Sequence, residues 1–235
     1  EQYPFFESRF RSTCHDPRGA GQTICTKTPP WSIADMAADC AALIREVCNP
    51  PVILTGLSMG GLITQQVAID YPELVKLAIP MGTAANCRDG YVREFMVADV
   101  AFRRAGGRLS PALATTYYGV LSYPAEVLGD PELWARLSAA LTPRDERRNS
   151  EDLEAQWQAC IDFDCDEGLR TCQVPMHVIA FGEDMQTPPA VGKKVADLAP
   201  NGHFHLMPGL GHCSMRGHRP DDVSRKILEI IEGYS

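Results

Sequence analysis

The sequence predicts an α/β fold with a mostly parallel sheet, interrupted by a block of inserted helices. Residues 52–54 form a short β-branched, apolar run that is typical of a strand buried on both faces, and a helical pattern over residues 62–71 follows it directly. Residues 75–79 predict a second buried strand, so the three segments make the βαβ unit of a parallel sheet. This α/β rhythm resumes at residues 174–181, where a further strand is expected.

Local patterns predict the remaining elements of the sheet layer. The end of a helix near residue 11 is expected to run into a short strand at residues 10–14. Ser32 and Asp35 predict a capping box at the start of an amphipathic helix that ends near Cys48. The elements expected after residue 181 are a helix at 189–198, a strand at 203–207 and a last helix at 221–232.

The inserted block covers residues 87–166 and shows no convincing strand pattern. Its helices are expected at residues 91–104, 111–118, 131–140 and 150–163. Helices inserted at the carboxyl edge of such a sheet would lie over the place where open α/β folds bind ligands. We therefore expect a core made of residues 1–86 and 167–235 and a helical cap made of residues 87–166, with a purely structural insertion as the alternative.

The composition is that of an acidic globular chain. Its 235 residues carry a formal net charge of −8, and 45% of them are hydrophobic. The acidic balance argues against nucleic acid as a partner, and no apolar stretch reaches the roughly 18–20 residues of a membrane span. The opening residues lack the pattern of a signal peptide. We expect a cytoplasmic protein that acts on a small molecule, without a membrane, and leave a homodimer open.

The nine cysteines are scattered, with no C-x-x-C pair and no histidine at zinc-finger spacing. Several of them, such as Cys40 and Cys48, fall where a helix would bury a small apolar side chain. We expect mostly reduced thiols in the core, with one or two disulfides left open.

Ser58 is the candidate nucleophile. It lies in Gly56-Leu57-Ser58-Met59-Gly60, the spacing G-x-S-x-G, between a predicted strand and a predicted helix. So tight a reversal forces the serine into a strained backbone conformation, and the flanking glycines are expected to remove side chains that would clash. The hydroxyl would then lie above the sheet edge at a helix N-terminus, which favours negative charge. An ordinary serine in a glycine-rich turn is the alternative.

A serine hydroxyl needs a base, and the base needs an orienting acid. His212 is the candidate base, because it lies in a glycine-loosened loop after a late strand. Asp184 is the candidate acid, in the loop directly after the strand at 174–181, and the adjoining Glu183 is the alternative acid.

Four motifs together resemble the α/β-hydrolase superfamily. They are Asp16-Pro-Arg-Gly-Ala-Gly21, Gly56-Leu-Ser-Met-Gly-Gly61, Gly182-Glu-Asp184 with Thr187-Pro188, and Gly211-His212. They span nearly the whole chain, and the order Ser58, Asp184, His212 is the one expected for this fold. Within the superfamily the chain is most similar to 3-oxoadipate enol-lactonases, bacterial carboxylesterases and cofactor-free haloperoxidase-perhydrolases.

The resemblance implies an α/β-hydrolase fold and a role for each candidate. Ser58 would be the nucleophile, His212 the general base and then the acid, and Asp184 its orienting partner, with no cofactor and no metal. Members of the family carry a His-Gly segment whose backbone N–H supplies half of the oxyanion hole, and no such dipeptide precedes Asp16. We expect that this donor and the first strands lie outside the sequence given, with the lack of a standard oxyanion hole as the alternative. Only the Met59 N–H is assigned to the hole. Losing one such donor typically costs about 10²–10³ in rate.

The other titratable residues have less specific patterns. One of His203 and His205 is expected to face the core, His177 is expected to be structural, and His15 and His218 are expected at the surface. A second set is expected to form a solvated acidic turn, with a metal site as the alternative: Asp162, Asp164 and Asp166. Cys213 adjoins His212, but the elbow geometry belongs to Ser58.

These observations predict a serine hydrolase that cleaves a small, apolar carboxylic ester or lactone through an acyl-enzyme. Thioesterases, C–C bond hydrolases and perhydrolases use the same triad and remain alternatives, as does a non-catalytic receptor on this fold. Aromatic and apolar residues of the inserted block could line an acyl pocket or pack its helices together: Phe95, Met96, Phe102, Tyr117, Tyr118, Trp134 and Trp157.

Overall fold

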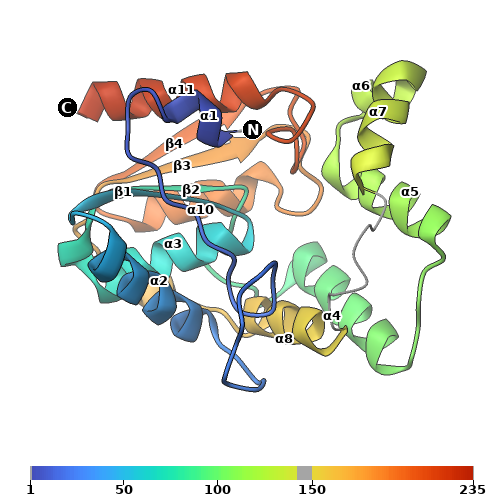
Figure 1. Cartoon of the computed structure of the whole chain (residues 1–235), viewed down its shortest axis with the longest axis horizontal. Coiled ribbons are helices and arrows are strands. Elements are labelled where there is room, and N and C mark those ends of the chain that lie inside the picture. The colour runs from blue at the N-terminus through green and yellow to red at the C-terminus, as the bar shows by residue number, and fades with distance from the viewer. Residues whose placement is uncertain (1, 142–149, 235) are drawn as a thin grey trace.

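The computed structural model describes residues 2–141 and 150–234. These residues form one four-stranded sheet in the order β1-β2-β3-β4, and every neighbouring pair is parallel (Figure 1). The strands are β1 (Val52–Leu57), β2 (Val75–Met81), β3 (Met176–Phe181) and β4 (Gly202–Met207). The predicted parallel α/β sheet is confirmed.

Helices cover both faces of the sheet. One face packs against α2 (Ile33–Val47), α3 (Met59–Asp70) and α10 (Pro189–Leu198), and the other against α1 (Gln2–Phe6) and α11 (Pro220–Tyr234). A 3₁₀ turn, η1 (Pro72–Leu74), joins α3 to β2. From Leu77 onward strand β2 is buried on both faces, which explains the apolar run there: Leu77 and Ile79 face α11, whereas Ala78 lies in the core beneath α2 and α3.

Helix α2 starts as its sequence predicts. The Asp35 N–H donates to Ser32 Oγ at 3.0 Å, and the Ser32 N–H donates back to Asp35 Oδ2 at 3.0 Å. This reciprocal capping box satisfies two amide groups that have no partner inside the helix. The helix ends at Val47, just before Pro50 and Pro51.

In the described part of the segment between β2 and β3, helices joined by loops are the regular elements, beside one isolated bridge between Asn86 and Asp164. The helices are α4 (Gly90–Arg104), α5 (Pro111–Ser122), α6 (Ala125–Gly129), α7 (Pro131–Leu141), α8 (Ser150–Ile161) and α9 (Asp166–Thr171). Helices α4 and α8 pack together through Met96, Val100 and Ile161, whereas α5, α6 and α7 gather around Tyr123 and Val127. Figure 1 shows the two groups beyond one end of the sheet.

Three sequence expectations differ from the structure. Residues 11–16 have no regular structure instead of a strand, and the segment is largely exposed and pairs with none of the described strands. The short helices α6 and α9 were not predicted, because five or six residues carry too little periodicity. Helix α5 continues past residue 118 to Ser122 and includes Gly119. A Cβ at Gly119 would lie 2.3 Å from the Trp134 ring, so the close contact with α7 requires glycine there.

The longest described helices have 15 residues, and no helix in the described ranges combines the length and apolarity needed to cross a membrane.

Candidate active site

Ser58 occupies a sharp, strained turn between β1 and α3. Among the described residues it alone, apart from glycines, has a positive φ (56°, with ψ −119°). Its N–H donates to Met81 O at 2.9 Å, and its carbonyl accepts from Gly61 N at 2.8 Å and Leu62 N at 3.1 Å. Hydrogen bonds to β2 on one side and to the first turn of α3 on the other therefore keep Ser58 in this strained conformation.

The glycines around Ser58 differ in what they do. A Cβ on Gly56 would lie 2.2 Å from Gly60 O, and one on Gly61 would lie 2.7 Å from Thr83 Cβ, so neither position admits a side chain. A Cβ on Gly60 would meet nothing within 4 Å. Both Gly56 and Gly60 were expected to relieve clashes. This is right for Gly56, which lies against the backbone of Gly60, and wrong for Gly60 itself.

Asp184 and His212 form a buried, hydrogen-bonded pair. Asp184 follows β3 and His212 follows β4, so both lie at the carboxyl edge of the sheet, where Ser58 follows β1. The distance between Asp184 Oδ2 and His212 Nδ1 is 2.7 Å, and each residue is 4% exposed. Glu183 is exposed, so the alternative acid does not occupy this place.

Gly82, directly after β2, leaves room for this pair. It has φ +46°, and a Cβ there would lie 3.3 Å from Asp184 Oδ2 and 3.4 Å from His212 Nδ1. Because Ser58 N–H is bonded to Met81 O, the residue before Gly82, the same short segment borders both the serine turn and the acid–base pair. The described contacts include no direct hydrogen bond between Ser58 Oγ and His212, and such bonds often tighten only when substrate binds.

Four hydrogen bonds hold the Asp184 carboxylate. Oδ1 accepts from the N–H groups of Gln186 at 2.9 Å and Thr187 at 2.8 Å. Oδ2 accepts from Thr187 Oγ1 at 2.8 Å and from His212. Thr187 Oγ1 also lies 3.2 Å from His212 Nδ1, so this hydroxyl contacts both members of the pair. The sequence offered only Thr187-Pro188 as part of a motif and gave Thr187 no role.

Met59 is the first residue of α3, so its N–H has no acceptor inside the helix. It follows Ser58 directly and lies at the positive end of the helix dipole. This is the position expected of an oxyanion-hole donor, which takes the negative charge of a tetrahedral intermediate.

Three of the other histidines lie within β3 and β4, before the carboxyl ends of these strands: His177, His203 and His205. His177 is near the amino end of β3 and pairs in register with His203, and its Nδ1 is 3.0 Å from His205 Nε2. Burial, together with His203 and His205, lowers the pKa of His177 to about 4. His203 and His205 are two residues apart in one strand and share a face. His205 is half-buried and His203 is exposed, so the expectation that one of the two turns inward holds for His205. His218 is half-buried against Ser214 Oγ rather than at the surface.

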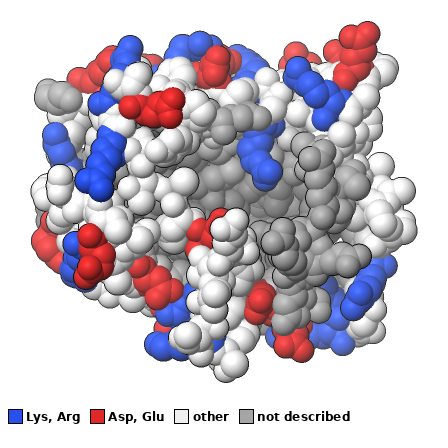
Figure 2. Space-filling model, in the orientation of Figure 1, with Lys and Arg blue, Asp and Glu red and all other residues white. Residues whose placement is uncertain are grey.

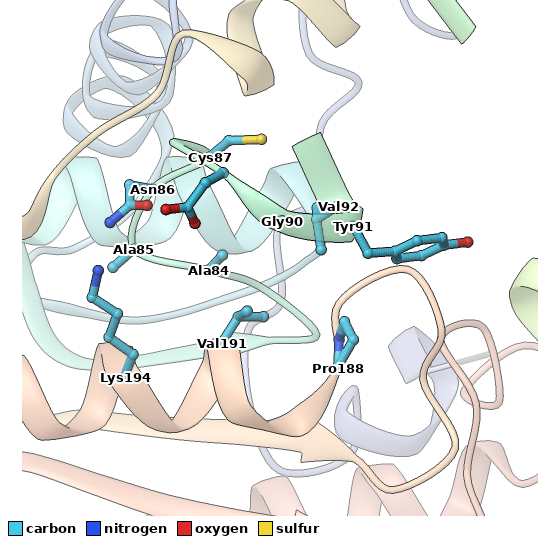
Figure 3. Close-up of a pocket in the computed structure, with 11 residues that line it drawn as sticks. Ala84, Ala85, Asn86, Cys87, Gly90, Tyr91, Val92, Pro188, Val191 and Lys194 are labelled. Carbon is cyan, nitrogen blue, oxygen red and sulfur yellow. The ribbon is translucent and has the colours of Figure 1, made fainter. Parts of the chain in front are cut away.

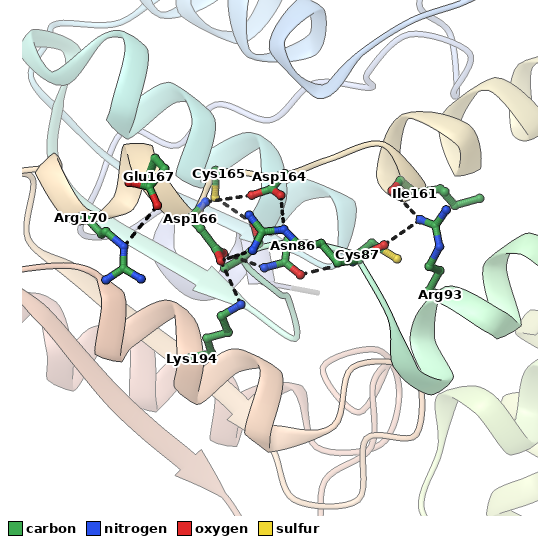
Figure 4. Close-up of polar contacts among 12 residues, drawn as sticks. Asn86, Cys87, Arg93, Ile161, Asp164, Cys165, Asp166, Glu167, Arg170 and Lys194 are labelled. Carbon is green, nitrogen blue, oxygen red and sulfur yellow. Dashed lines mark hydrogen bonds and ion pairs between the residues drawn. The ribbon is translucent and has the colours of Figure 1, made fainter.

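The acidic turn is not wholly solvated, and Figure 4 shows polar contacts of two of its members, Asp164 and Asp166. Its members are Asp162, Asp164 and Asp166. The side chain of Asp166 is 6% exposed and accepts from Asn86 Nδ2 at 2.7 Å, Arg88 Nη1 at 3.0 Å and Lys194 Nζ at 3.0 Å. Burial alone would raise the pKa of Asp166, but the hydrogen bonds from Asn86 and Lys194 lower it. Asp166 is therefore bonded to two cationic side chains, and the described residues contain no group of three or more His, Cys, Asp and Glu that could hold a metal ion.

The cysteines are free thiols in this structure. Burial raises the pKa of Cys40 to about 11 and that of Cys160 to about 12. Burial also raises the pKa of Cys213, which packs against the Tyr123 cluster. A thiol held in its protonated form is a weak nucleophile, so Cys213 does not compete with Ser58.

Two surface features bear on ligands. A pocket of about 250 Å³ lies between α10 and the segment after β2, lined by Ala84, Cys87, Tyr91, Pro188 and Lys194 among others (Figure 3). None of the three candidate catalytic residues lines it. On the face that Figure 2 shows, acidic and basic side chains are intermixed rather than gathered into one basic patch.

Comparison with known proteins identifies the family. The model of the alpha/beta hydrolase family matches residues 3–226, which is nearly the whole chain. The chain belongs to the alpha/beta hydrolase family, as its motifs and sheet predicted.

Two relatives and one solved structure illustrate the similarity. The chain is 28% identical over 227 residues to a Mycobacterium tuberculosis protein named "Putative non-heme bromoperoxidase BpoC". The matched region covers 97% of this chain and 85% of that protein. It is 28% identical over 193 residues to 3-oxoadipate enol-lactonase 2 of Acinetobacter baylyi, covering 82% of this chain and 68% of the lactonase. The crystal structure of the Mycobacterium tuberculosis protein has a TM-score of 0.85 at 27% identity and covers 94% of this chain and 80% of that one. The expected likeness to the lactonase and haloperoxidase branch is confirmed.

Proposed function

We propose that the protein is a serine hydrolase that cleaves a small, apolar carboxylic ester or lactone through an acyl-enzyme. The observation that carries the proposal is the buried Asp184–His212 pair, joined at 2.7 Å, on the sheet edge where Ser58 takes its strained conformation. A base that is oriented by an acid and lies at the same end of the sheet as a strained serine turn is what nucleophilic acyl transfer requires.

The mechanism follows from the donors and acceptors of these residues. His212 removes the proton from Ser58 Oγ as the oxygen attacks the carbonyl carbon, and the Met59 N–H donates to the resulting oxyanion. The imidazolium then protonates the leaving alkoxide, which leaves an acyl-serine. His212 next activates a water that attacks the acyl carbon, and release of the acid restores Ser58. Asp184 keeps the Nδ1 proton of His212 in place, so that Nε2 is free to accept.

The inserted segment, residues 87–166, is proposed to be the cap over this edge. Some of its aromatic rings pack against one another: Phe95 lies 6.2 Å from Tyr117 and 5.8 Å from Trp157 between ring centroids, which favours a role in packing the inserted helices together. The enol-lactonase relative favours an ester or lactone as substrate. The homodimer and the cytoplasmic location stay predictions.

Perhydrolysis is the second candidate, because the Mycobacterium tuberculosis relative is named as a non-heme bromoperoxidase. In that reaction hydrogen peroxide replaces water in the attack on the acyl-serine and a peracid leaves. Incubation with acetate and hydrogen peroxide, followed by a peracid assay, separates it from simple hydrolysis.

Labelling with a fluorophosphonate probe, followed by turnover of short p-nitrophenyl esters, tests the proposal. The wild-type chain should be labelled and should release p-nitrophenol, and Ser58→Ala should do neither. Labelling that survives in Ser58→Ala would contradict the assignment of the nucleophile. Labelling without turnover on a panel of esters, lactones and thioesters would favour the receptor alternative.

A further inference from the structure

The loop that carries His212 is bonded to the connection between α5 and α6, residues 121–124, here called the α5–α6 junction. The N–H of Cys213, the residue after His212, donates to Ser122 O at 2.8 Å. Three residues further on, Arg216 O accepts from Tyr123 Oη at 2.9 Å. The junction therefore bonds the backbone of this loop at two points, the N–H of Cys213 and the carbonyl of Arg216.

The loop that carries Asp184 reaches the same junction through Gln186. The Gln186 N–H donates to Asp184 Oδ1 at 2.9 Å, and its side-chain Nε2 donates to Leu121 O at 3.1 Å. One residue thus bonds the proposed catalytic carboxylate with its backbone and the junction with its side chain. Neither bond follows from a local pattern, because 65 residues separate Gln186 from Leu121.

The junction and the His212 loop are in close contact. A Cβ on Gly211 would lie 3.0 Å from both Ser122 O and Pro124 N, so a larger residue there would have to push the junction away. The junction is itself anchored in the inserted segment, since Tyr123 is 5% exposed and packs with Val127 and Leu137 of α6 and α7. Helices α5–α7 and the two loops therefore behave as one packed unit.

We propose that the α5–α6 junction positions the acid and the base together, and that Tyr123 and Gln186 are the positioning residues through which it does so. This inference rests on the proposed function, since it assigns a role within the same Asp184–His212 pair. Neither residue contacts the reacting atoms. They bond the loop of Asp184 and the loop of His212 to the same junction. This keeps His212 Nδ1 and Asp184 Oδ2 within hydrogen-bond distance when the cap admits a substrate.

The expected effect is on the chemical step. A misplacement of catalytic groups by about 1 Å can cost about 10² in rate, and loss of two supporting hydrogen bonds should produce part of that. The variants Tyr123→Phe and Gln186→Met keep the size of each side chain and remove its donor. The double variant should lose about 10-fold in kcat with KM changed less than about 2-fold, and its rate of labelling by the fluorophosphonate probe should fall equally.

A matched control is available in the other half of the inserted segment. Gln158 on α8 bonds Asp162 and Arg104 and contacts neither loop through any described hydrogen bond. Gln158→Met removes the same kind of donor, so it should leave kcat, KM and the labelling rate unchanged. Thermal unfolding of each variant shows how much of a loss comes from a less stable fold.

The outcomes separate this inference from the proposed function. Labelling of Ser58→Ala as fast as wild type overturns the proposed function. Normal labelling and turnover by wild type, with the double variant within about 2-fold of it in kcat and labelling rate, overturns the inference alone. A rise in KM with unchanged kcat also overturns it, because the two residues would then act on binding. If Tyr123→Phe does not fold, Gln186→Met alone should still lower kcat and the labelling rate, and unchanged values overturn the inference.

Discussion

The hydroxyl of Thr187 offers a quantitative test of how the Asp184–His212 pair is held. It donates to Asp184 Oδ2 at 2.8 Å and lies 3.2 Å from His212 Nδ1. Thr187→Val keeps the shape of the side chain and removes this one bond. The carboxylate would keep its two backbone donors on Oδ1, but Oδ2 would be bonded by the imidazole alone.

The magnitude follows from the charge of the acceptor. A hydrogen bond to a charged group is worth about 1.5–3 kcal/mol, and the lower end applies because Thr187 is only half-buried. We therefore expect the free energy of unfolding to fall by about 1.5 kcal/mol. If half to all of this stabilisation also orients the pair during the reaction, kcat should fall about 3- to 12-fold.

Ester turnover and urea unfolding measure the two effects, and Thr187→Ser is the matched control because it retains the hydroxyl. The serine variant should keep kcat within about 2-fold of wild type. Equal losses in the valine and serine variants would assign the effect to the missing methyl group and its packing. Wild-type kcat in Thr187→Val would refute the reasoning outright.

Three other substitutions have clear expected outcomes. Asp184→Asn should lower kcat by about 10³–10⁴ with a small change in KM, because an amide does not hold the Nδ1 proton of His212, and activity close to wild type would remove Asp184 from the mechanism. Asp166→Asn should lower the free energy of unfolding by about 1–3 kcal/mol in urea, since it weakens a buried carboxylate bonded to Asn86, and an unchanged midpoint would show that the cluster adds no stability. His177→Phe should flatten the pH dependence of stability. The pKa of His177 in the folded chain, about 4, lies below the ordinary 6.5, so the unfolded chain binds more protons in between and stability is lost as pH falls through that window. The full pKa shift would lower the free energy of unfolding by about 2.5 kcal/mol between pH 7 and 4.5. We expect a loss of about 1 kcal/mol, because the ring is only half-buried and solvent screens its charge. If wild type and His177→Phe lose equal free energy of unfolding between pH 7 and 4.5, this role of His177 is contradicted.

Local signals in the sequence were enough to predict the sheet and the three candidate residues. The strand, the G-x-S-x-G spacing and the helix after it specify the turn at Ser58 without any long-range contact. Asp184 and His212 were found because each follows a recognisable strand, and carboxyl ends of parallel strands meet at one edge.

The support of these residues depends on contacts between distant segments and could not be predicted. Gly82 looks like any glycine after a strand until its neighbours are known to be Asp184 and His212. Tyr123 and Gln186 show no pattern at all, since their partners lie 93 and 65 residues away.

Two errors have a similar origin. A strand was expected at residues 10–14 from composition, but a strand forms only where a neighbouring strand supplies hydrogen bonds. Asp166 was expected in solvent because it lies among other acidic residues, whereas Arg88 and Lys194 approach it from elements far along the chain.

Mass spectrometry of the fluorophosphonate adduct tests the central claim, that Ser58 is the nucleophile activated by His212 and Asp184. The wild-type chain should carry one adduct, mapped to Ser58, and the adduct should form far more slowly in His212→Ala. An adduct on another residue, or one that forms at the wild-type rate in His212→Ala, would contradict the account.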